Sequence, residues 1–369
     1  MNKFIVGGDF YISDFFYDKK NNYWGELESR INDAEFFFVN VEAPITKSSN
    51  AIDKTGPAIR MNADVINCLK VNDNTIATLA NNHINDFGSA GVLDTINILN
   101  NNDILCIGAG RDIDAASEAL EIRINDCKVA IINTCEAEWC GGGAGPGANT
   151  INVSRLYSQI SFLKAENDFV VVIIHGGSEF YELPSPKRQE LYRLLVSFGA
   201  SAVVSHHTHC ISGVEFYKGV PIVYSLGNLL FPLSSPSKEW NNGMLAEFTV
   251  SKESGLSLEL IPYKFECNKM LQSLNVEEVK HFNEKIQKLN SIILDEIELK
   301  RRWDEYCTSQ LGSIVNSICL PRSINFIFRK LKLNIKSKGL KFKLLNYLRC
   351  ETHLDVLSTA IEIESNKRV

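Results

Sequence analysis

The sequence lacks the features of a membrane-spanning or secreted protein. No stretch reaches the roughly 18 consecutive apolar residues that a transmembrane helix needs. The N-terminus, MNKFIVGGDF, carries one lysine and an apolar run that is too short for the core of a signal peptide. We therefore expect a soluble, cytoplasmic protein without a signal peptide or a transmembrane helix.

The spacing of the cysteines does not indicate a disulfide framework either. The chain has 10 cysteines among 369 residues, but they are scattered and form no CxxC pair, the nearest two being Cys135 and Cys140. Such spacing indicates reduced, mostly buried thiols. A hydrophobic fraction of 45% and a charged fraction of 22% are ordinary for globular proteins and exclude extensive disorder.

Negative charge is in excess, with a net charge of −6, but the balance is uneven. Residues 329–349 contain eight Lys or Arg and no Asp or Glu, so the rest of the chain carries about −14 (−6 minus 8). Basic and apolar residues interleave there, which makes the segment a candidate for contact with a membrane surface or an anionic polymer. The alternative is a solvated basic helix face. No nucleic-acid-reading motif accompanies the charge, so we expect no nucleic-acid partner.

Short β-branched and aromatic runs predict buried strands, and amphipathic segments at 89–102 and 185–199 predict helices between them. This alternation is typical of an α/β fold with a largely parallel sheet. Three later runs, GVEFYKG, VPIVYSL and MLAEFTVS, predict hairpin strands. The predicted buried strands are 3–8, 34–41, 75–80, 128–134, 169–174 and 201–205.

The pattern changes after residue 265. NVEEVKHFNEKIQKLNSIILDEIELKRRWDEYC has charged residues at helical i,i+4 spacing. We therefore predict two domains, 1–265 and a helical C-terminal extension at 266–369.

Histidine is scarce, yet three of the seven fall within four positions of the stretch VVSHHTHCIS. Polar residues likewise follow four of the other predicted strands, and the carboxyl ends of strands in open α/β sheets border a common ligand crevice. Each group alone could be a cap, a turn or a core histidine. Together, carboxylate, imidazole and amide donors suit a borderline cation such as Mn, Fe, Zn or Co. The residues at these five strand ends are Asp9, Glu42, Asn81, Asn82, His83, His175, His206, His207 and His209.

Seven motifs occur in an order that resembles the bacterial capsule-synthesis protein CapA family, the poly-γ-glutamate branch of the calcineurin-like metallophosphatase superfamily. The resemblance covers about residues 3–265. It implies a four-layer αββα sandwich that holds two divalent metal ions, Mn, Fe or Zn. The motifs are GD (8–9), NVEAPIT (40–46), LANNHINDFG (79–88), GAGRDIDAA (108–116), HGGSEF (175–180), SHHTH (205–209) and YSLGNLLF (224–231).

The resemblance also implies roles for individual residues. His83 would assist departure of the leaving group, and Glu179 would act as an acid, a base or a substrate clamp. His206, Asp86 and Asn228 would orient the ligands through hydrogen bonds. The implied metal ligands are Asp9, Glu42, Asn82, His175, His207 and His209.

Three positions depart from the metallophosphatase pattern. Tyr11 stands where a histidine usually follows the first aspartate, Glu42 replaces the bridging aspartate, and Gly176 replaces the tryptophan of an HWGxE motif. Cys210, next to His209, is expected to be a buried packing residue rather than a metal ligand.

Two functional hypotheses follow from the resemblance, both within the biosynthesis of a capsule or surface polymer of the poly-γ-glutamate type. In the first, the protein is a metal-dependent hydrolase that uses metal-activated water on a phosphoester or amide bond. In the second, it is a non-catalytic accessory protein that binds an anionic polymer or a lipid-linked precursor during assembly or export. Contact of residues 329–349 with the inner membrane face would suit the second.

Overall fold

The computed structural model describes residues 2–141, 145–233, 235, 237, 239–265, 270–318 and 338–366. Statements about the structure concern these residues. Of the basic segment 329–349, the part 329–337 lies outside them, whereas Lys338–Arg349 form helix α10.

Eight strands form the first sheet, in the order β16-β15-β14-β1-β2-β3-β4, with β13 also paired to β1. The part from β1 to β4 is parallel, whereas β14, β15 and β16 add antiparallel strands. The strands are β1 (Lys3–Phe10), β2 (Phe36–Val41), β3 (Thr75–Thr78), β4 (Leu105–Ile107), β13 (Asn228–Leu230), β14 (Asn242–Ser251), β15 (Gly255–Phe265) and β16 (Leu271–Ser273).

The second sheet has six strands in the order β11-β12-β10-β9-β7-β6. Its centre, from β7 to β12, is parallel, and β6 and β11 are antiparallel edges. A small antiparallel pair joins β5 (Ala109–Gly110) to β8 (Gly147–Ala148). The strands of the second sheet are β6 (Leu120–Ile124), β7 (Cys127–Cys135), β9 (Phe169–His175), β10 (Ala202–His206), β11 (Val214–Tyr217) and β12 (Val220–Val223).

The helices begin and end where local chemistry directs them. Helix α6 (Pro186–Phe198) has Ser185 as its N-cap, proline in its first turn, and Gly199 at φ 120° as its stop. The remaining elements are η1 (Gly25–Leu27), α1 (Glu28–Asn32), η2 (Ala63–Val65), α2 (Ile66–Leu69), α3 (Gly88–Asn100), α4 (Ile113–Ser117), α5 (Val153–Glu166), α7 (Val276–Leu294), α8 (Glu296–Ile318) and α11 (Glu351–Asn366).

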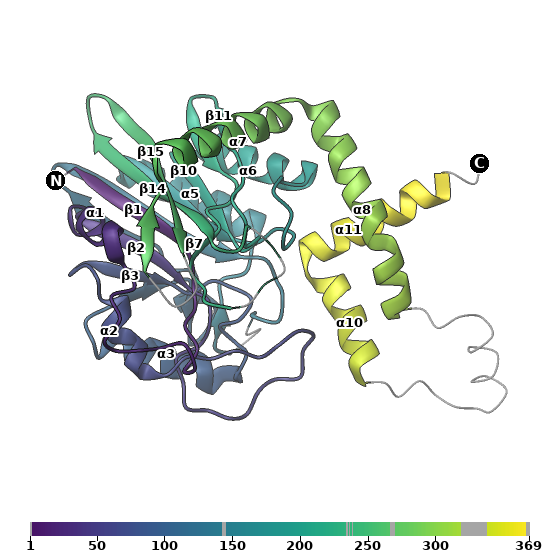
Figure 1. The fold of residues 1–369 in the computed structure, drawn as a ribbon, viewed down its shortest axis with the longest axis horizontal. Helices are drawn as coiled ribbons and strands as arrows, with labels where there is room; N and C mark the ends of the chain where they lie inside the picture. The colour runs from purple at the N-terminus through teal and green to yellow at the C-terminus, as the bar shows by residue number, and fades with distance from the viewer. Residues whose placement is uncertain are drawn as a thin grey trace.

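Alternation of side chains along the strands divides the core into three hydrophobic layers. Phe4 and Phe38 of the first sheet face Val171 and Val204 of the second and form the inner layer. The other face of the first sheet packs on α1, α2 and α3, and the other face of the second sheet packs on α5 and α6. The predicted αββα sandwich is therefore confirmed (Figure 1).

The predicted elements match the observed ones to within a few residues. The run at 34–41 begins its strand only at Phe36, and the run at 75–80 ends its strand at Thr78. The first sheet extends past residue 265, because β16 pairs with β15. The division into two domains stays a prediction.

The C-terminal helices α8, α10 and α11 stand beside the sandwich (Figure 1). Trp303 and Cys307 of α8 pack against Val356 and Ala360 of α11, and Tyr181 from the loop after β9 joins this small cluster. Helix α7 extends the inner core instead, through Phe282 and Ile286. Within the described ranges, no helix combines the length and the apolarity that crossing a bilayer requires.

The inner layer gives a stability test. Phe38 is fully buried between the sheets, so Phe38→Ala should lower the free energy of unfolding by about 3–5 kcal/mol. Phe216 on β11 is 63% exposed and serves as the control. Phe216→Ala should change the free energy of unfolding by less than about 0.5 kcal/mol. Urea unfolding of both variants measures the difference, and equal effects would contradict this account of the core.

Candidate metal centre

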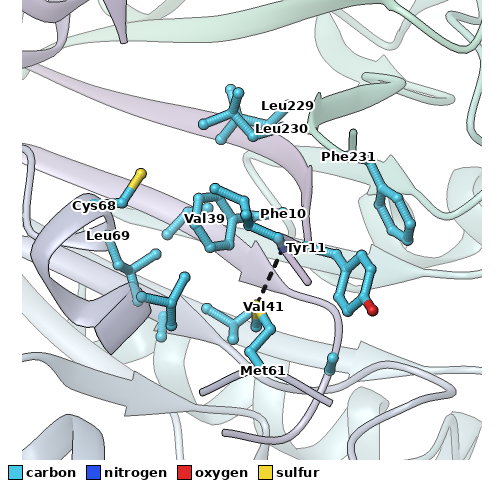
Figure 2. Close-up of a cluster of buried hydrophobic side chains, with 14 of the residues drawn as sticks. Phe10, Tyr11, Val39, Val41, Met61, Cys68, Leu69, Leu229, Leu230 and Phe231 are labelled. Atoms are coloured by element: carbon cyan, nitrogen blue, oxygen red, sulfur yellow. Dashed lines mark hydrogen bonds between the residues drawn. The ribbon is translucent and has the colours of Figure 1, made fainter. Parts of the chain in front are cut away.

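The strand pleat separates the polar residues of the site from the hydrophobic floor beneath them. Phe10, Val39 and Val41 pack on the outer face of the first sheet, near Cys68 and Leu69 of α2 (Figure 2). The alternate residues therefore point to the opposite face, toward the second sheet. These alternate residues are Asp9, Asn40 and Glu42.

Strand register brings the functional side chains together. Asp9 pairs with Asn40 across β1 and β2, and it pairs with Asn228 across β1 and β13. In the second sheet, His206 at the end of β10 lies opposite His175 at the end of β9. Both sheets thus end in polar residues at one place.

Asp9 is the most heavily contacted of these groups, and it is fully buried. Its Oδ1 accepts a hydrogen bond from Asn40 Nδ2 at 2.8 Å, and its Oδ2 accepts one from the His207 backbone N–H at 3.0 Å. His206 Nδ1 lies 3.0 Å from Oδ1. Burial alone would raise the pKa of Asp9, but His206 and His175 hold it well below its usual value.

Glu42 is equally buried but has no hydrogen-bond partner for either carboxyl oxygen among the described residues. The nearest imidazole nitrogens belong to His175 and His209, each 3.7 Å from Oε1. Burial, and then the charge of Asp9, keeps the pKa of Glu42 well above its usual value. A buried carboxyl without partners is costly, so this position favours a cation.

The imidazoles at the strand ends of the second sheet bring ring nitrogens into the same space. His175 Nε2 lies 2.9 Å from Asn82 Oδ1, and His175 Nδ1 lies 2.9 Å from His206 Nδ1. Burial lowers the pKa of His175 to about 3, and burial followed by His175 lowers the pKa of His207 well below its usual value. Neutral imidazoles are the form that binds metals.

The backbone of the HHTH segment adopts a conformation that non-glycine residues rarely take. His207 has φ 109° and His209 has φ 55°. Such strain persists where surrounding contacts enforce it, and it clusters at functional sites. His209 Nδ1 is held 2.8 Å from Asn228 Oδ1, while Asn228 donates to the Trp240 carbonyl.

His83 lies on the turn after β3, next to Asn82 in the chain, with 12% of its side chain exposed. Its Nδ1 is 2.7 Å from Asp86 Oδ2, and the ammonium of Lys54 pairs with the other oxygen of Asp86. Asp86 is fully buried and also accepts the Ile59 backbone N–H at 2.8 Å. Asp86 thereby holds Nδ1 of the His83 imidazole in place, and Nε2 is the ring nitrogen that Asp86 does not contact.

The structure brings most of the predicted site residues together. One ligand atom each from Asp9, His175 and His206 lies within 4.8 Å of the others, and the same holds for Glu42, His207 and His209. His206, which the resemblance places in a supporting role, thus offers a ligand atom of its own. Asn82 reaches the site through His175.

Glu179 does not join either ligand group. It lies exposed on the turn after β9, although its charge contributes to the raised pKa of Glu42. The nearby Gly176 has a clear packing reason, because a Cβ there would lie 2.8 Å from Glu136 Cγ. Glycine makes room for a buried ion pair between Glu136 and Arg188.

Atoms left without a partner test whether a metal fits. Among the described residues, Glu42 Oε1 and Oε2, His206 Nε2 and His207 Nδ1 are buried without a hydrogen bond. Carboxylate and imidazole donors of this kind match a borderline divalent cation, so the residues present fit the implied metal.

Asn40 and Lys54 belong to the site, but the sequence assigned neither of them a role. Asn40 bridges Asp9 and His175. Asn81, one of the predicted strand-end residues, accepts the backbone N–H groups of His83 and Ile84, which shapes the turn. Lys54 comes from a loop with no recognisable motif. Asn40 carried a signal, since it is the one amide in the apolar strand run FFFVNV.

The chain is similar to CapA proteins of two Bacillus species. The CapA capsule biosynthesis protein of Bacillus anthracis is 30% identical over 211 residues, which cover 54% of this chain and 51% of the relative. The PGA biosynthesis protein CapA of Bacillus subtilis (strain 168) is 30% identical over 198 residues, covering 52% of each chain. This chain therefore spans about half the length of these curated relatives.

Among solved structures, a 5′-nucleotidase from Candida albicans aligns with 81% of this chain and 58% of its own, with a TM-score of 0.40 and 11% identity. The fold assignment rests on the layers described above and not on this likeness.

The family model described as bacterial capsule synthesis protein PGA_cap matches residues 3–233. That match includes every strand end that contributes to the site. The chain therefore belongs to the PGA_cap family of bacterial capsule synthesis proteins.

Proposed function

We propose that this protein is a metal-dependent hydrolase in the biosynthesis of a bacterial surface polymer, acting on a phosphoester or amide bond. The observation that carries the proposal is the buried meeting of Asp9 and Glu42 with four imidazoles, several of whose polar atoms have no partner among the described residues. Family membership supports the biological setting.

The chain's own groups suit the binding of divalent metal. Asp9, Glu42, Asn82, His175, His207 and His209 would hold the ions, and His206 is placed to contribute. Bound divalent ions supply Lewis acidity and lower the pKa of bound water. Asn40 and the His207 backbone N–H hold the Asp9 carboxylate in place, while His206 and His175 keep its pKa low and the group ionised.

His83 is the residue best placed to move a proton. With Nδ1 held by Asp86, the imidazole has a fixed orientation, and Nε2 can donate a proton to the oxygen or nitrogen of the leaving group. Lys54 balances the charge of Asp86, so that Asp86 orients His83 without carrying an unpaired buried charge. Asp86 and Lys54 are positioning residues in this scheme.

A groove of about 920 Å³ lies beside the site, between the loop after β9 and helices α7 and α8. Phe180 belongs to its lining and also faces the His209 ring, at 6.3 Å between ring centroids. Lys285, Arg302 and Tyr306 also belong to its lining. The groove is large enough for a substrate of several units, which agrees with a polymer or its precursor.

Metal binding is tested by stability and by direct analysis. Mn²⁺ at about one hundred times its dissociation constant should stabilise the wild-type chain by about 2.7 kcal/mol for each site filled. The double variant His207→Ala/His209→Ala should lose most of this gain, because it removes two donors. Thermal unfolding with Mn²⁺ and with chelator, together with elemental analysis, measures both effects.

His281 provides the matched control for metal binding, since it lies exposed on α7, away from both ligand groups. His281→Ala should keep the full stabilisation by Mn²⁺. Failure of the wild-type chain to bind metal after reconstitution would overturn the site assignment.

Catalysis is tested separately, with an aryl phosphate and a phosphodiester as substrates and Mn²⁺ present. His83→Ala should lower kcat by about a hundredfold to ten-thousandfold while metal content stays unchanged. Asp86→Asn should also lower kcat and should shift its pH dependence, because the hydrogen bond to His83 changes character.

If metal binds stoichiometrically but the wild type and His83→Ala hydrolyse these substrates at equal background rates, the accessory role would be favoured over the hydrolase. Direct binding of poly-γ-glutamate without hydrolysis would then support a protein that binds polymer.

A further inference from the structure

A second cluster of metal-ligating side chains lies where the C-terminal helices meet the sandwich. Glu138 follows β7, Cys350 lies between α10 and α11, and His353 is in the first turn of α11. One ligand atom from each lies within 4.8 Å of the other two. Cys350 and His353 are three residues apart, a spacing that puts both on one side of a helix start.

An amide side chain is aimed into this cluster. Asn346 Nδ2 lies 3.0 Å from Glu138 Oε1 and 3.1 Å from His353 Nδ1, so a donor stands between two groups with lone pairs. Asn346 is only 9% exposed, and its Oδ1 has no hydrogen-bond partner among the described residues. Turning the amide over would present that oxygen to a cation at the same point.

We propose that Glu138, Cys350 and His353 form a separate zinc site that fastens helices α10 and α11 to the sandwich. Thiolate, imidazole and carboxylate are the donors that Zn²⁺ takes in proteins, and Asn346 or a water would complete four-coordination. The site is distinct from the candidate metal centre, whose donors are oxygen and nitrogen only.

The charge balance supports a divalent ion. Glu138 and the Cys350 thiolate together carry two negative charges, which Zn²⁺ neutralises. Binding requires that the Cys350 thiol loses its proton to solvent, and a bound cation offsets the cost of holding the thiolate in a buried position. Without the metal, burial keeps the pKa of Cys350 well above its usual value, so the thiol stays protonated.

The zinc site would connect the C-terminal helices to the candidate metal centre. Asn82, an implied ligand of that centre, lies with its Nδ2 3.5 Å from the second oxygen of Glu138. The α11 residues Glu351 and Thr352 also reach the loop after β7, where Glu351 accepts a hydrogen bond from Ala137 N and the Thr352 hydroxyl donates one to Glu136. Zinc would therefore strengthen an existing junction.

Cobalt substitution tests the proposal on the full chain. Metal-free protein titrated with Co²⁺ should develop a thiolate-to-cobalt charge-transfer band, which oxygen and nitrogen ligands cannot give. Cys350→Ser should abolish the band. His353→Ala, at a side chain one-third exposed, should weaken Co²⁺ binding at this site by at least about tenfold while circular dichroism stays unchanged.

Two controls separate this site from the other. Cys210→Ser removes the thiol next to His209 and should keep the band, and His207→Ala/His209→Ala, which disables the candidate metal centre, should also keep it. Absence of the band in the wild type, or its survival in Cys350→Ser, would overturn the zinc site and leave the hydrolase proposal untouched. If Cys350→Ser does not fold, unchanged Co²⁺ binding at this site in His353→Ala would equally overturn the zinc-site proposal.

Discussion

The structure depends on the burial of two carboxyl groups among four imidazoles, at the line where two sheets end. Asp9, Glu42 and His206 have no exposed surface at all. Such a cluster is unfavourable unless charges are paired and hydrogen-bonded. Asn40 and the His207 backbone satisfy Asp9, but Glu42 has no comparable partner among the described residues. Because Asp9 has hydrogen-bond partners and Glu42 lacks them among the described residues, a cation is the simplest complement to the site.

The surrounding fold holds those groups at fixed separations. The parallel registers of β1 with β2 and of β9 with β10 fix which residues end side by side, and the inner hydrophobic layer fixes the distance between the sheets. Because interiors are close-packed, a shift of one sheet would open cavities along the whole layer. The strained φ angles of His207 and His209 are therefore held by packing on both sides rather than by local preference.

The sequence predicted the parts of this arrangement that depend on local pattern. Short apolar strand runs, amphipathic helical segments such as 185–199, and the polar residues at five strand ends can all be read along the chain. Contacts between distant segments could not be predicted from pattern. Lys54 reaches Asp86 from a loop without a motif, and Asn346 reaches Glu138 from more than two hundred residues away, so nothing local marks either partner.

Gly176 shows how one such distant contact bears on the site. Glycine leaves space for the buried pair of Glu136 and Arg188 directly beside His175. A buried ion pair is stable only when its remaining donors and acceptors are met, and Thr352 of α11 supplies that contact at both ends, with Arg188 Nη2 2.8 Å from its Oγ1. Tyr192 accepts a further hydrogen bond from Arg188. Helix α11 thus completes the polar network behind the HGGSEF loop, so this part of the candidate metal centre's surroundings includes residues from near the C-terminal end of the described chain.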